Sequence, residues 1–264
     1  MTQGQEPWGL DLDTGFLREQ RRFEKEGGKP GELARIKKRE FYLFRNCDII
    51  GIHSPVERDI ILSEMPGADV EVIPLPIQDL APSEAAFDKR RGLLFVGGTH
   101  PPNVDALRYF IGEILPLLVR EIPELRLTVV GEVSRHELKD LDLGQVNFTG
   151  YVEDLRPLFE QALVYVAPLR FGAGIKGKIL EAINYGVPVV TTSIGAEGIG
   201  VVDGENILIA DSAAAFCEAV VRLHRDKELW GELRDKGREY VETSFSQQAF
   251  QARVDQVMKK LLKT

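Results

Sequence analysis

The segment LVYVAPLRFGAGIKGKILEAINYGVPVVTTSI, residues 163–194, holds the pattern that decides the fold. An apolar run at Leu163–Pro168 is followed by a glycine loop at Arg170–Gly174. The next residues, Ile175–Tyr185, repeat apolar side chains with the period of a helix, and a second apolar run covers Val187–Thr192. Apolar run, helical segment and apolar run in this order predict a βαβ unit with two parallel strands.

The predicted helix has two chemically different faces. The apolar face has the spacing that suits packing on a sheet and consists of Ile175, Ile179, Ala182 and Ile183. The opposite face consists of Gly174, Gly177, Lys178 and Glu181. Free N–H groups and the helix dipole favour an anion at the bare glycine end. Ordinary turn glycines and a solvated Lys–Glu pair explain the same residues equally well when the segment is read alone.

The alternation of strands and helices continues on both sides of this segment. Apolar strands are predicted at Gly92–Val96, Leu125–Val130 and Val146–Thr149. Helices are predicted at Asn103–Leu118, His136–Leu141, about 154–163 and Ser212–Arg225, with two more, Glu228–Thr243 and Ser246–Leu262, at the C-terminal end. This order predicts an α/β fold with a doubly wound parallel sheet over residues 92–225.

The first 74 residues predict a smaller, partial α/β unit. We expect residues 1–15 to be loop, and two charged helices between Phe16 and Arg45, separated at Gly27–Gly31. Short strands are expected at Cys47–Ile52 and Asp69–Ile73, with a helix capped by Ser54 between them. Two strands are few for an independent core, so we expect an incomplete domain.

Composition excludes several classes of protein. The 264 residues carry a formal net charge of −8, which argues against a nucleic-acid-binding surface. The sequence contains no run of 18 apolar residues and no signal-peptide pattern near its first residues. The four histidines lack metal-ligand spacing, so no metal site is predicted. We expect a soluble, cytoplasmic protein.

Glycines follow four of the predicted strands, at Gly97-Gly98, Gly131, Gly150 and the loop Gly172–Gly174. Ligands of open parallel sheets bind outside the carboxyl ends of the strands, so a long ligand in close contact with backbone is expected there. The segment GGTHPPN lacks the dinucleotide fingerprint G-x-G-x-x-G, and the sequence has neither a P-loop G-K-[ST] nor a hydrolase G-x-S-x-G.

Four segments together resemble a known family: LLFVGGTHPPNVDAL, VNFTGYVEDL, APLRFGAGIKGKILEAINYGVPVVTTSIGAEGI and REYVETSFS. They resemble the nucleotide-sugar-binding half of GT-B fold glycosyltransferases, of the retaining family 4 type, over about residues 92–250. The resemblance implies a partial N-terminal, acceptor-type domain at 1–76 and a linker at 77–91. It further implies a Rossmann-like nucleotide-sugar-binding domain at 92–245, and a C-terminal helix at 246–264 that packs back on the N-terminal part.

The resemblance also implies a donor site. Glu181 matches a glutamate that binds the ribose hydroxyls, and the backbone of Gly172, Ala173, Gly174 and Ile175 matches a loop that faces the diphosphate and the sugar. Lys178 would lie near the phosphates and is the candidate catalytic residue. Val152 matches a segment that reads the base, and Gly97 and Gly98 match a loop in close contact with the ligand.

Three departures from the family pattern stand out. Ala173 occupies the position of the family's first glutamate, eight residues before Glu181. The usual Arg and Lys after the first strand are absent, and the loop offers His100 and Asn103 instead, which leaves the diphosphate to Lys178 and Arg170. Most of the family's N-terminal domain, with its acceptor site, has no counterpart, which implies a fragment or a chain that needs a partner.

The resemblance implies a hexosyltransferase of polysaccharide biosynthesis that moves a sugar from a UDP-, GDP- or similar nucleotide sugar to a glycan, lipid or protein acceptor. It implies retention of configuration, and neither a metal nor a cofactor is expected. A non-catalytic nucleotide-sugar-binding or scaffolding module is the alternative, and a nucleotide-sugar epimerase is a third option because it shares the architecture.

Overall fold

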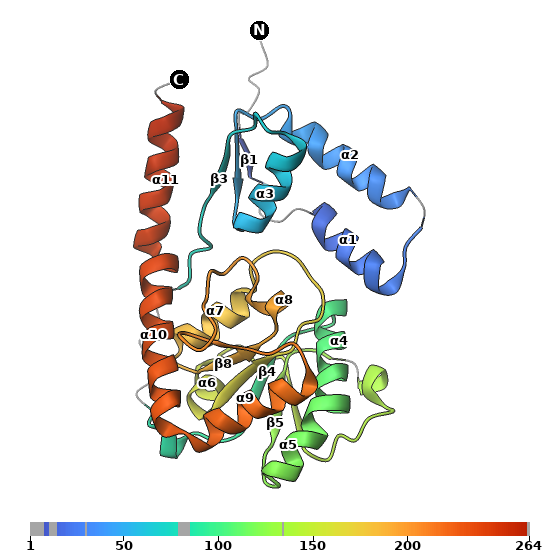
Figure 1. Cartoon of the computed structure of the whole chain (residues 1–264), viewed down its shortest axis with the longest axis vertical. Coiled ribbons are helices and arrows are strands. Elements are labelled where there is room, and N and C mark those ends of the chain that lie inside the picture. Colours follow the sequence, from blue (N-terminus) through green and yellow to red (C-terminus); the bar gives the residue numbers. More distant parts are fainter. Residues whose placement is uncertain (1–7, 11–14, 30, 79–84, 134, 263–264) are drawn as a thin grey trace.

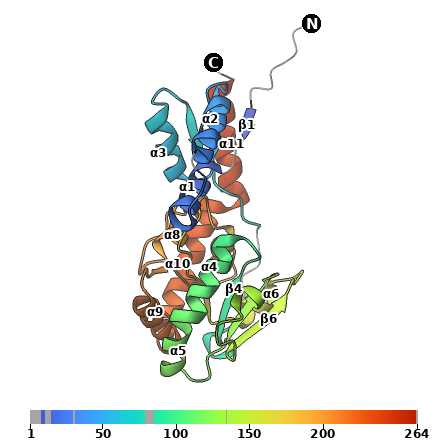
Figure 2. The same ribbon diagram turned by 90° about the vertical axis from the view of Figure 1, so that its right-hand side faces the viewer.

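The structure is a computed structural model that describes residues 8–10, 15–29, 31–78, 85–133 and 135–262. Figure 1 shows a larger part built on one sheet, a smaller part built on a second sheet, and a long helical segment that runs beside both. The view in Figure 2 shows the same helical segment, α10 and α11, running past both parts. The linker predicted at 77–91 falls partly outside the described residues, at 79–84.

The larger sheet has six strands, all parallel, in the order β6-β5-β4-β7-β8-β9. Its strands are β4 (Leu93–Val96), β5 (Leu127–Val130), β6 (Val146–Gly150), β7 (Val164–Ala167), β8 (Val189–Thr191) and β9 (Leu208–Ile209). The predicted doubly wound parallel sheet is therefore confirmed. The chain moves outward from β4 in one direction and from β7 in the other, so the topological switch point lies between these two strands.

Helices cover both faces of this sheet. One face packs against α4 (Pro101–Tyr109), the π-helical turn η2 (Phe110–Ile114), α5 (Leu115–Glu121) and α9 (Ala213–Arg225). The other packs against α6 (Arg156–Gln161), α7 (Gly177–Asn184) and α10 (Lys227–Phe245). In β4 the side chains alternate between the two cores, with Leu93 and Phe95 in the first and Leu94 in the second. Both faces of the strand are thus buried, which explains its continuous apolar sequence.

Three local expectations need correction. The helix α7 begins at Gly177 rather than Ile175, because Gly174 has a φ of +71° and Lys176 is not helical. The helix expected at His136–Leu141 is a 3₁₀ turn, η3 (Arg135–Leu138). Residues 8–10, expected to be loop, form the strand β1 (Trp8–Leu10). Short elements also occur at η1 (Phe87–Lys89) and α8 (Ser193–Ala196).

The smaller part has a parallel sheet in the order β1-β2-β3, with β2 (Ile49–Ile52) in the centre and β3 (Val70–Val72) at one edge. Its helices are α1 (Gly15–Glu26), α2 (Glu32–Phe44) and α3 (Pro55–Glu64). The Ser54 hydroxyl accepts a hydrogen bond from the Val56 N–H at 3.3 Å, which confirms the predicted N-cap of α3. The buried core of this part consists of Phe41, Phe44, Ile50, Ile52 and Ile61.

The last helix, α11 (Gln247–Leu261), is bonded to the edge of the smaller sheet. Arg253 Nε donates to the Val72 carbonyl oxygen at 2.8 Å, and Lys260 Nζ lies 2.8 Å from Glu71 Oε1. α10 packs against α7 in the larger part. The two C-terminal helices therefore connect the larger sheet to β3 (Figure 1).

Candidate functional site

A cavity of about 490 Å³ lies at the carboxyl ends of the central strands. We call it the sheet-edge cavity. Its walls are residues 95–98, 130–131, 151–153 and 176–179, together with Asn103, Leu155, Tyr165, Ala167 and Leu169. These residues follow β4, β5, β6 and β7 or begin α7, so the cavity lies at the topological switch point. Ligands of open α/β sheets bind at this location.

A second cavity of about 500 Å³ adjoins the first and shares Asn103, Leu169 and Lys176 with it. We call it the loop cavity. It lies between the glycine loop after β7, the loop after β4 and the helix α1, and its other walls are Glu19, Arg22, residues 100–102, Phe171, Gly172, Ala173 and Ile175. The two cavities together extend from the sheet edge to the smaller part of the molecule.

Two backbone segments come close together in the wall of the sheet-edge cavity, and their contact requires glycine at position 131. Gly131 has a φ of +115°, and a Cβ atom at this position would lie 2.2 Å from the Gly97 carbonyl oxygen. Gly131 N–H also donates to the Gly150 carbonyl oxygen at 2.8 Å. The glycines that follow three of the predicted strands are thus packed against one another. Side chains there would displace the loops that form the cavity wall.

Lys178 and Glu181 form an ion pair along α7. The distance between Lys178 Nζ and Glu181 Oε2 is 2.8 Å, and their side chains are 49% and 31% exposed. Lys178 lines the sheet-edge cavity, whereas Glu181, one turn further along the helix, lies outside the lining of both cavities. The pair is solvated, as the simpler interpretation of the sequence expects.

Arg170 lines neither cavity, and its side chain bonds the start of the glycine loop to Asp105 of α4. Its Nη2 lies 2.6 Å from Asp105 Oδ1 and its Nε 3.0 Å from Asp105 Oδ2. The guanidinium carbon lies 4.7 Å from the centroid of the Tyr109 ring. The hydrogen bond to Asp105 raises the pKa of Arg170, so this side chain stays cationic.

Only some residues of the glycine loop face a cavity. Gly172, Ala173 and Ile175 line the loop cavity, and Gly172 has a φ of +135°. Gly174 lines neither cavity, and its carbonyl oxygen accepts a hydrogen bond from Lys176 Nζ at 2.8 Å. Lys176 lies at the junction of the two cavities, and sequence reasoning missed it. The signal was present, because two lysines flank Gly177.

Two tyrosines and a valine complete the sheet-edge cavity. The Tyr165 hydroxyl donates to the Val96 carbonyl oxygen at 3.4 Å, and burial raises the pKa of Tyr165, so the phenol is neutral. Tyr151 is 76% exposed although it is a large aromatic residue, and Val152 lies next to it in the cavity wall. Gly97 and Gly98 line the same cavity.

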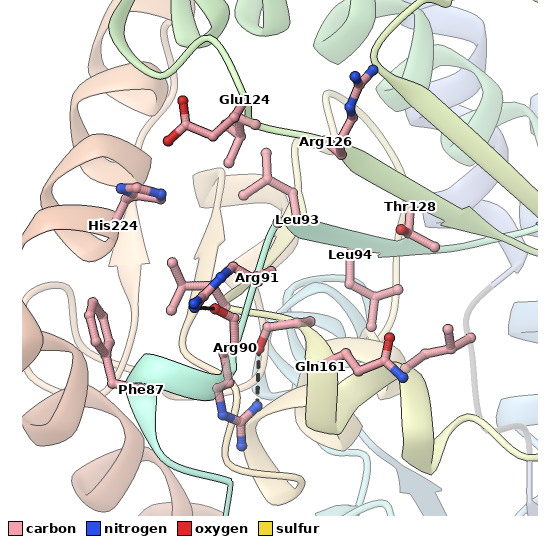
Figure 3. A pocket seen from close by; sticks show the side chains of 15 residues that line it. Phe87, Arg90, Arg91, Leu93, Leu94, Glu124, Arg126, Thr128, Gln161 and His224 are labelled. Carbon is pink, nitrogen blue, oxygen red and sulfur yellow. Dashed lines mark hydrogen bonds between the residues drawn. The ribbon is translucent and has the colours of Figure 1, made fainter.

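A third cavity, of about 520 Å³, lies at the opposite edge of the sheet, where β4 and β5 begin (Figure 3). Arg90 is 1% exposed there, and its Nη1 donates to the carbonyl oxygens of Phe159 and Ala162 at 2.8 and 3.0 Å. Its guanidinium carbon lies 5.2 Å from the Trp230 ring centroid. Burial lowers the pKa of Arg90 to about 10. These contacts join α6 and α10, which gives Arg90 a structural role.

Within the described part of the chain, no group of three or more His, Cys, Asp or Glu side chains is arranged to hold a metal ion. The helices that the structure describes include none with the length and apolarity needed to cross a membrane.

Two solved structures with a similar fold are distant from this chain in sequence. A TarM variant of S. aureus, in complex with Fondaparinux, alpha-GlcNAc-glycerol and UDP, superposes with a TM-score of 0.76 at 16% identity, over 93% of this chain and 49% of that protein. Sucrose-phosphate synthase of Thermosynechococcus elongatus gives 0.72 at 20% identity, over 92% of this chain and 65% of the synthase. These similarities confirm the GT-B type of fold.

The chain also resembles an uncharacterized 44.6 kDa protein in the cps region of Klebsiella pneumoniae, with 28% identity over 144 residues. This match covers 51% of the present chain and 37% of the Klebsiella protein. The chain thus spans about half the length of TarM and about a third of the Klebsiella protein.

The profile of one family, glycosyl transferases group 1, matches residues 90–226, which is just over half of the chain. These residues contain the switch point, the glycine loop and most of the walls of both cavities. The chain therefore belongs to the glycosyl transferase group 1 family.

Proposed function

We propose that the chain binds a nucleoside diphosphate sugar in the sheet-edge and loop cavities and serves to transfer its sugar to an acceptor. The observation that carries this proposal is the position of the sheet-edge cavity at the switch point, with close backbone contacts on one wall and two lysines, Lys176 before α7 and Lys178 in its first turn, on another. Bare backbone and ammonium groups are suited to a diphosphate, which needs many donors and positive charge.

In this proposal each wall binds one portion of the donor. The base lies by Tyr151 and Val152, and the diphosphate lies between Lys176 and Lys178. Glu181, one turn beyond Lys178 and outside the cavity lining, accepts hydrogen bonds from the ribose hydroxyls. Lys178 then divides its contacts between Glu181 and the phosphates, which the partial exposure of the pair permits. The exposed ring of Tyr151 gains a stacking partner when the base binds.

In this scheme the rate depends on how well the protein stabilises the negative charge that develops on the leaving diphosphate. Lys176, Lys178 and the N–H groups at the start of α7 stabilise that charge, which is the form of catalysis that fixed dipoles and cations provide. Retention of configuration follows from the family 4 resemblance. Arg170, which the resemblance assigns to the diphosphate, has its guanidinium bonded to Asp105.

Two relatives favour uridine as the base and a polysaccharide as the product. The pneumococcal O-GlcNAc transferase GtfA, solved with UDP and GlcNAc, has a TM-score of 0.70 at 15% identity. The Klebsiella relative is encoded in a cps region. We infer a UDP-sugar donor, a cytoplasmic site of polysaccharide synthesis, and an acceptor domain or partner chain that supplies the acceptor site.

Titration calorimetry with UDP, GDP and ADP tests the proposal. One of the three is expected to bind, and Glu181→Ala is expected to weaken that nucleotide by about 10- to 100-fold, because hydrogen bonds to a charged group contribute about 1.5–3 kcal/mol each. Glu205→Ala is the matched control, since Glu205 is exposed and lines neither cavity. Failure of all three nucleotides to bind at millimolar concentration would refute the proposal.

A non-catalytic binding module is the second candidate. Ala173 in the loop cavity favours it, because the family resemblance places a glutamate at that position. Chromatography of a UDP-sugar incubated with the chain separates the two candidates. Release of UDP supports a transferase, whereas tight binding without release supports a module.

A further inference from the structure

The helix α1 forms the wall of the loop cavity that faces the glycine loop. Figures 1 and 2 both show α1 on the side of the smaller part that faces α4 and α8. We propose that Glu19 of α1 binds hydroxyl groups of the donor's sugar across this cavity and so determines recognition of the sugar. This inference rests on the proposed function and names a residue of its site that the family resemblance does not assign.

A hydrogen-bonded contact fixes α1 against the glycine loop. Arg21 Nη1 donates to the Gly172 carbonyl oxygen at 2.7 Å, and the same guanidinium is paired with Glu197 at 2.6 Å. Glu19 lies two residues before Arg21 on the same helix. The position of Glu19 beside the loop is therefore determined by side-chain bonds and not by the mere proximity of two parts of the molecule.

The glycine loop contributes no polar side chain to the cavity. Phe171, Gly172, Ala173 and Ile175 present only backbone and apolar atoms, and the start of α4 adds two prolines together with the polar residues His100 and Asn103. A sugar in this space has hydroxyl groups that must find acceptors when they leave water. Among the described residues that line the loop cavity, Glu19 is the one carboxylate.

The chemistry of Glu19 suits this task. Arg22 Nη2 lies 2.6 Å from Glu19 Oε2 in a charge-assisted contact. An ionised carboxylate has two oxygens with about four lone-pair directions, so it accepts from two adjacent hydroxyls while it keeps its contact with arginine. Glu19 thereby supplies from α1 the carboxylate that the loop lacks at Ala173.

The location of Glu19 also places it on the side of the donor's sugar and away from the nucleoside. Glu19 lines the loop cavity and not the sheet-edge cavity, and Lys176 lies where the two meet. A diphosphate at Lys176 therefore has the nucleoside on one side and the sugar on the side of α1. Loss of Glu19 is expected to affect the sugar nucleotide and not the free nucleotide.

Calorimetry with UDP, UDP-glucose and UDP-N-acetylglucosamine tests this difference, with the guanosine or adenosine counterparts where GDP or ADP is the nucleotide that binds. Glu19→Gln and Glu19→Ala are expected to lower the affinity for at least one sugar nucleotide by about tenfold and to leave that for the free nucleotide within twofold, as loss of a charged hydrogen bond predicts. Glu24→Gln is the matched control, because Glu24 is an exposed residue of the same helix bonded to Gln20.

Three results would overturn the inference or its basis, and they are distinguishable. Unchanged affinity for all the sugar nucleotides in both variants means that Glu19 does not touch the sugar. An equal loss for the free and the sugar nucleotide means that Glu19 acts by holding the glycine loop. Absence of any nucleotide binding by the unmodified chain rejects the proposed function itself. Urea unfolding of each variant verifies that the fold is retained.

Discussion

Arg21 and Glu197 form a bidentate ion pair between the smaller part of the molecule and the region after α8. The two residues are 176 positions apart in the sequence. Arg21 Nη1 and Nη2 lie 2.6 Å from Glu197 Oε1 and Oε2. Their side chains are 17% and 20% exposed. Because Nη1 also donates to the Gly172 carbonyl oxygen, the pair holds the glycine loop in place.

A double-mutant cycle of Arg21→Ala and Glu197→Ala measures this pair. We expect a coupling energy of about 1–2 kcal/mol by urea unfolding, between the values for exposed and for fully buried pairs. Arg225 and Glu121, 58% and 52% exposed at 3.1 Å, provide a control cycle with a coupling below about 1 kcal/mol. Equal coupling energies in the two cycles would contradict the inference that the Arg21–Glu197 pair holds the glycine loop in place.

Gly131→Ala is expected to destabilise the fold by about 2–5 kcal/mol. A left-handed φ costs a non-glycine residue about 1–2 kcal/mol, and the new Cβ meets the Gly97 carbonyl oxygen, which adds a packing cost of about 1–3 kcal/mol. Gly231→Ala in α10 has open space around it and is expected to be neutral or to stabilise by up to about 1 kcal/mol. Chemical denaturation of both variants provides the comparison.

Lys176→Ala and Lys178→Ala are each expected to weaken UDP binding by about tenfold, the loss predicted for one charged contact to phosphate. The affinity for uridine, which has no phosphate, is expected to stay the same. Lys236→Ala, an exposed lysine of α10, is the control. If Lys176→Ala leaves UDP binding unchanged, the junction of the two cavities does not hold the diphosphate.

His224 is expected to make the protein less stable on the acid side of neutrality. Burial lowers the pKa of His224, with a further lowering by Arg225 and Arg91 and an opposing effect of Glu124. The unfolded chain therefore binds a proton near pH 6.5 before the folded one does, so the free energy of unfolding falls as the pH falls below about 6.5.

Urea unfolding at pH 7.5 and 5.5 checks this prediction. His224→Gln is expected to lose less stability between the two values than the unmodified chain does. His136→Gln, at an exposed position, is the control. It is expected to lose as much stability between the two pH values as the unmodified chain does. An identical pH dependence for His224→Gln and the unmodified chain would show that the burial of His224 has no such effect.

The sequence determined the larger sheet and the location of its cavity. Runs such as Leu93–Val96 and Val164–Ala167 are apolar on both faces, a pattern that a doubly covered parallel strand requires. Parallel strands bring their carboxyl ends to one edge, so the glycines after them had to converge there. Gly97, Gly98, Val152 and Lys178 line the sheet-edge cavity for this reason.

Short elements were harder to predict, because a three-residue strand such as Trp8–Leu10 carries too little pattern of its own. Its hydrogen bonds come from β2, about 40 residues later. The start of α7 also depends on the backbone angles of Gly174, and a helical period in the sequence does not reveal where the helix begins.

Only the tertiary structure decided which charged side chains meet. Arg170 lies next to the glycine loop in sequence, yet it is bonded to Asp105, 65 residues earlier. Glu19 comes from a helix that the sequence predicts only as charged, yet it lines the same cavity as Ala173. Apolar periodicity is a local signal that the chain itself displays. The pairing of charges depends on distances across the folded molecule, which no local pattern records.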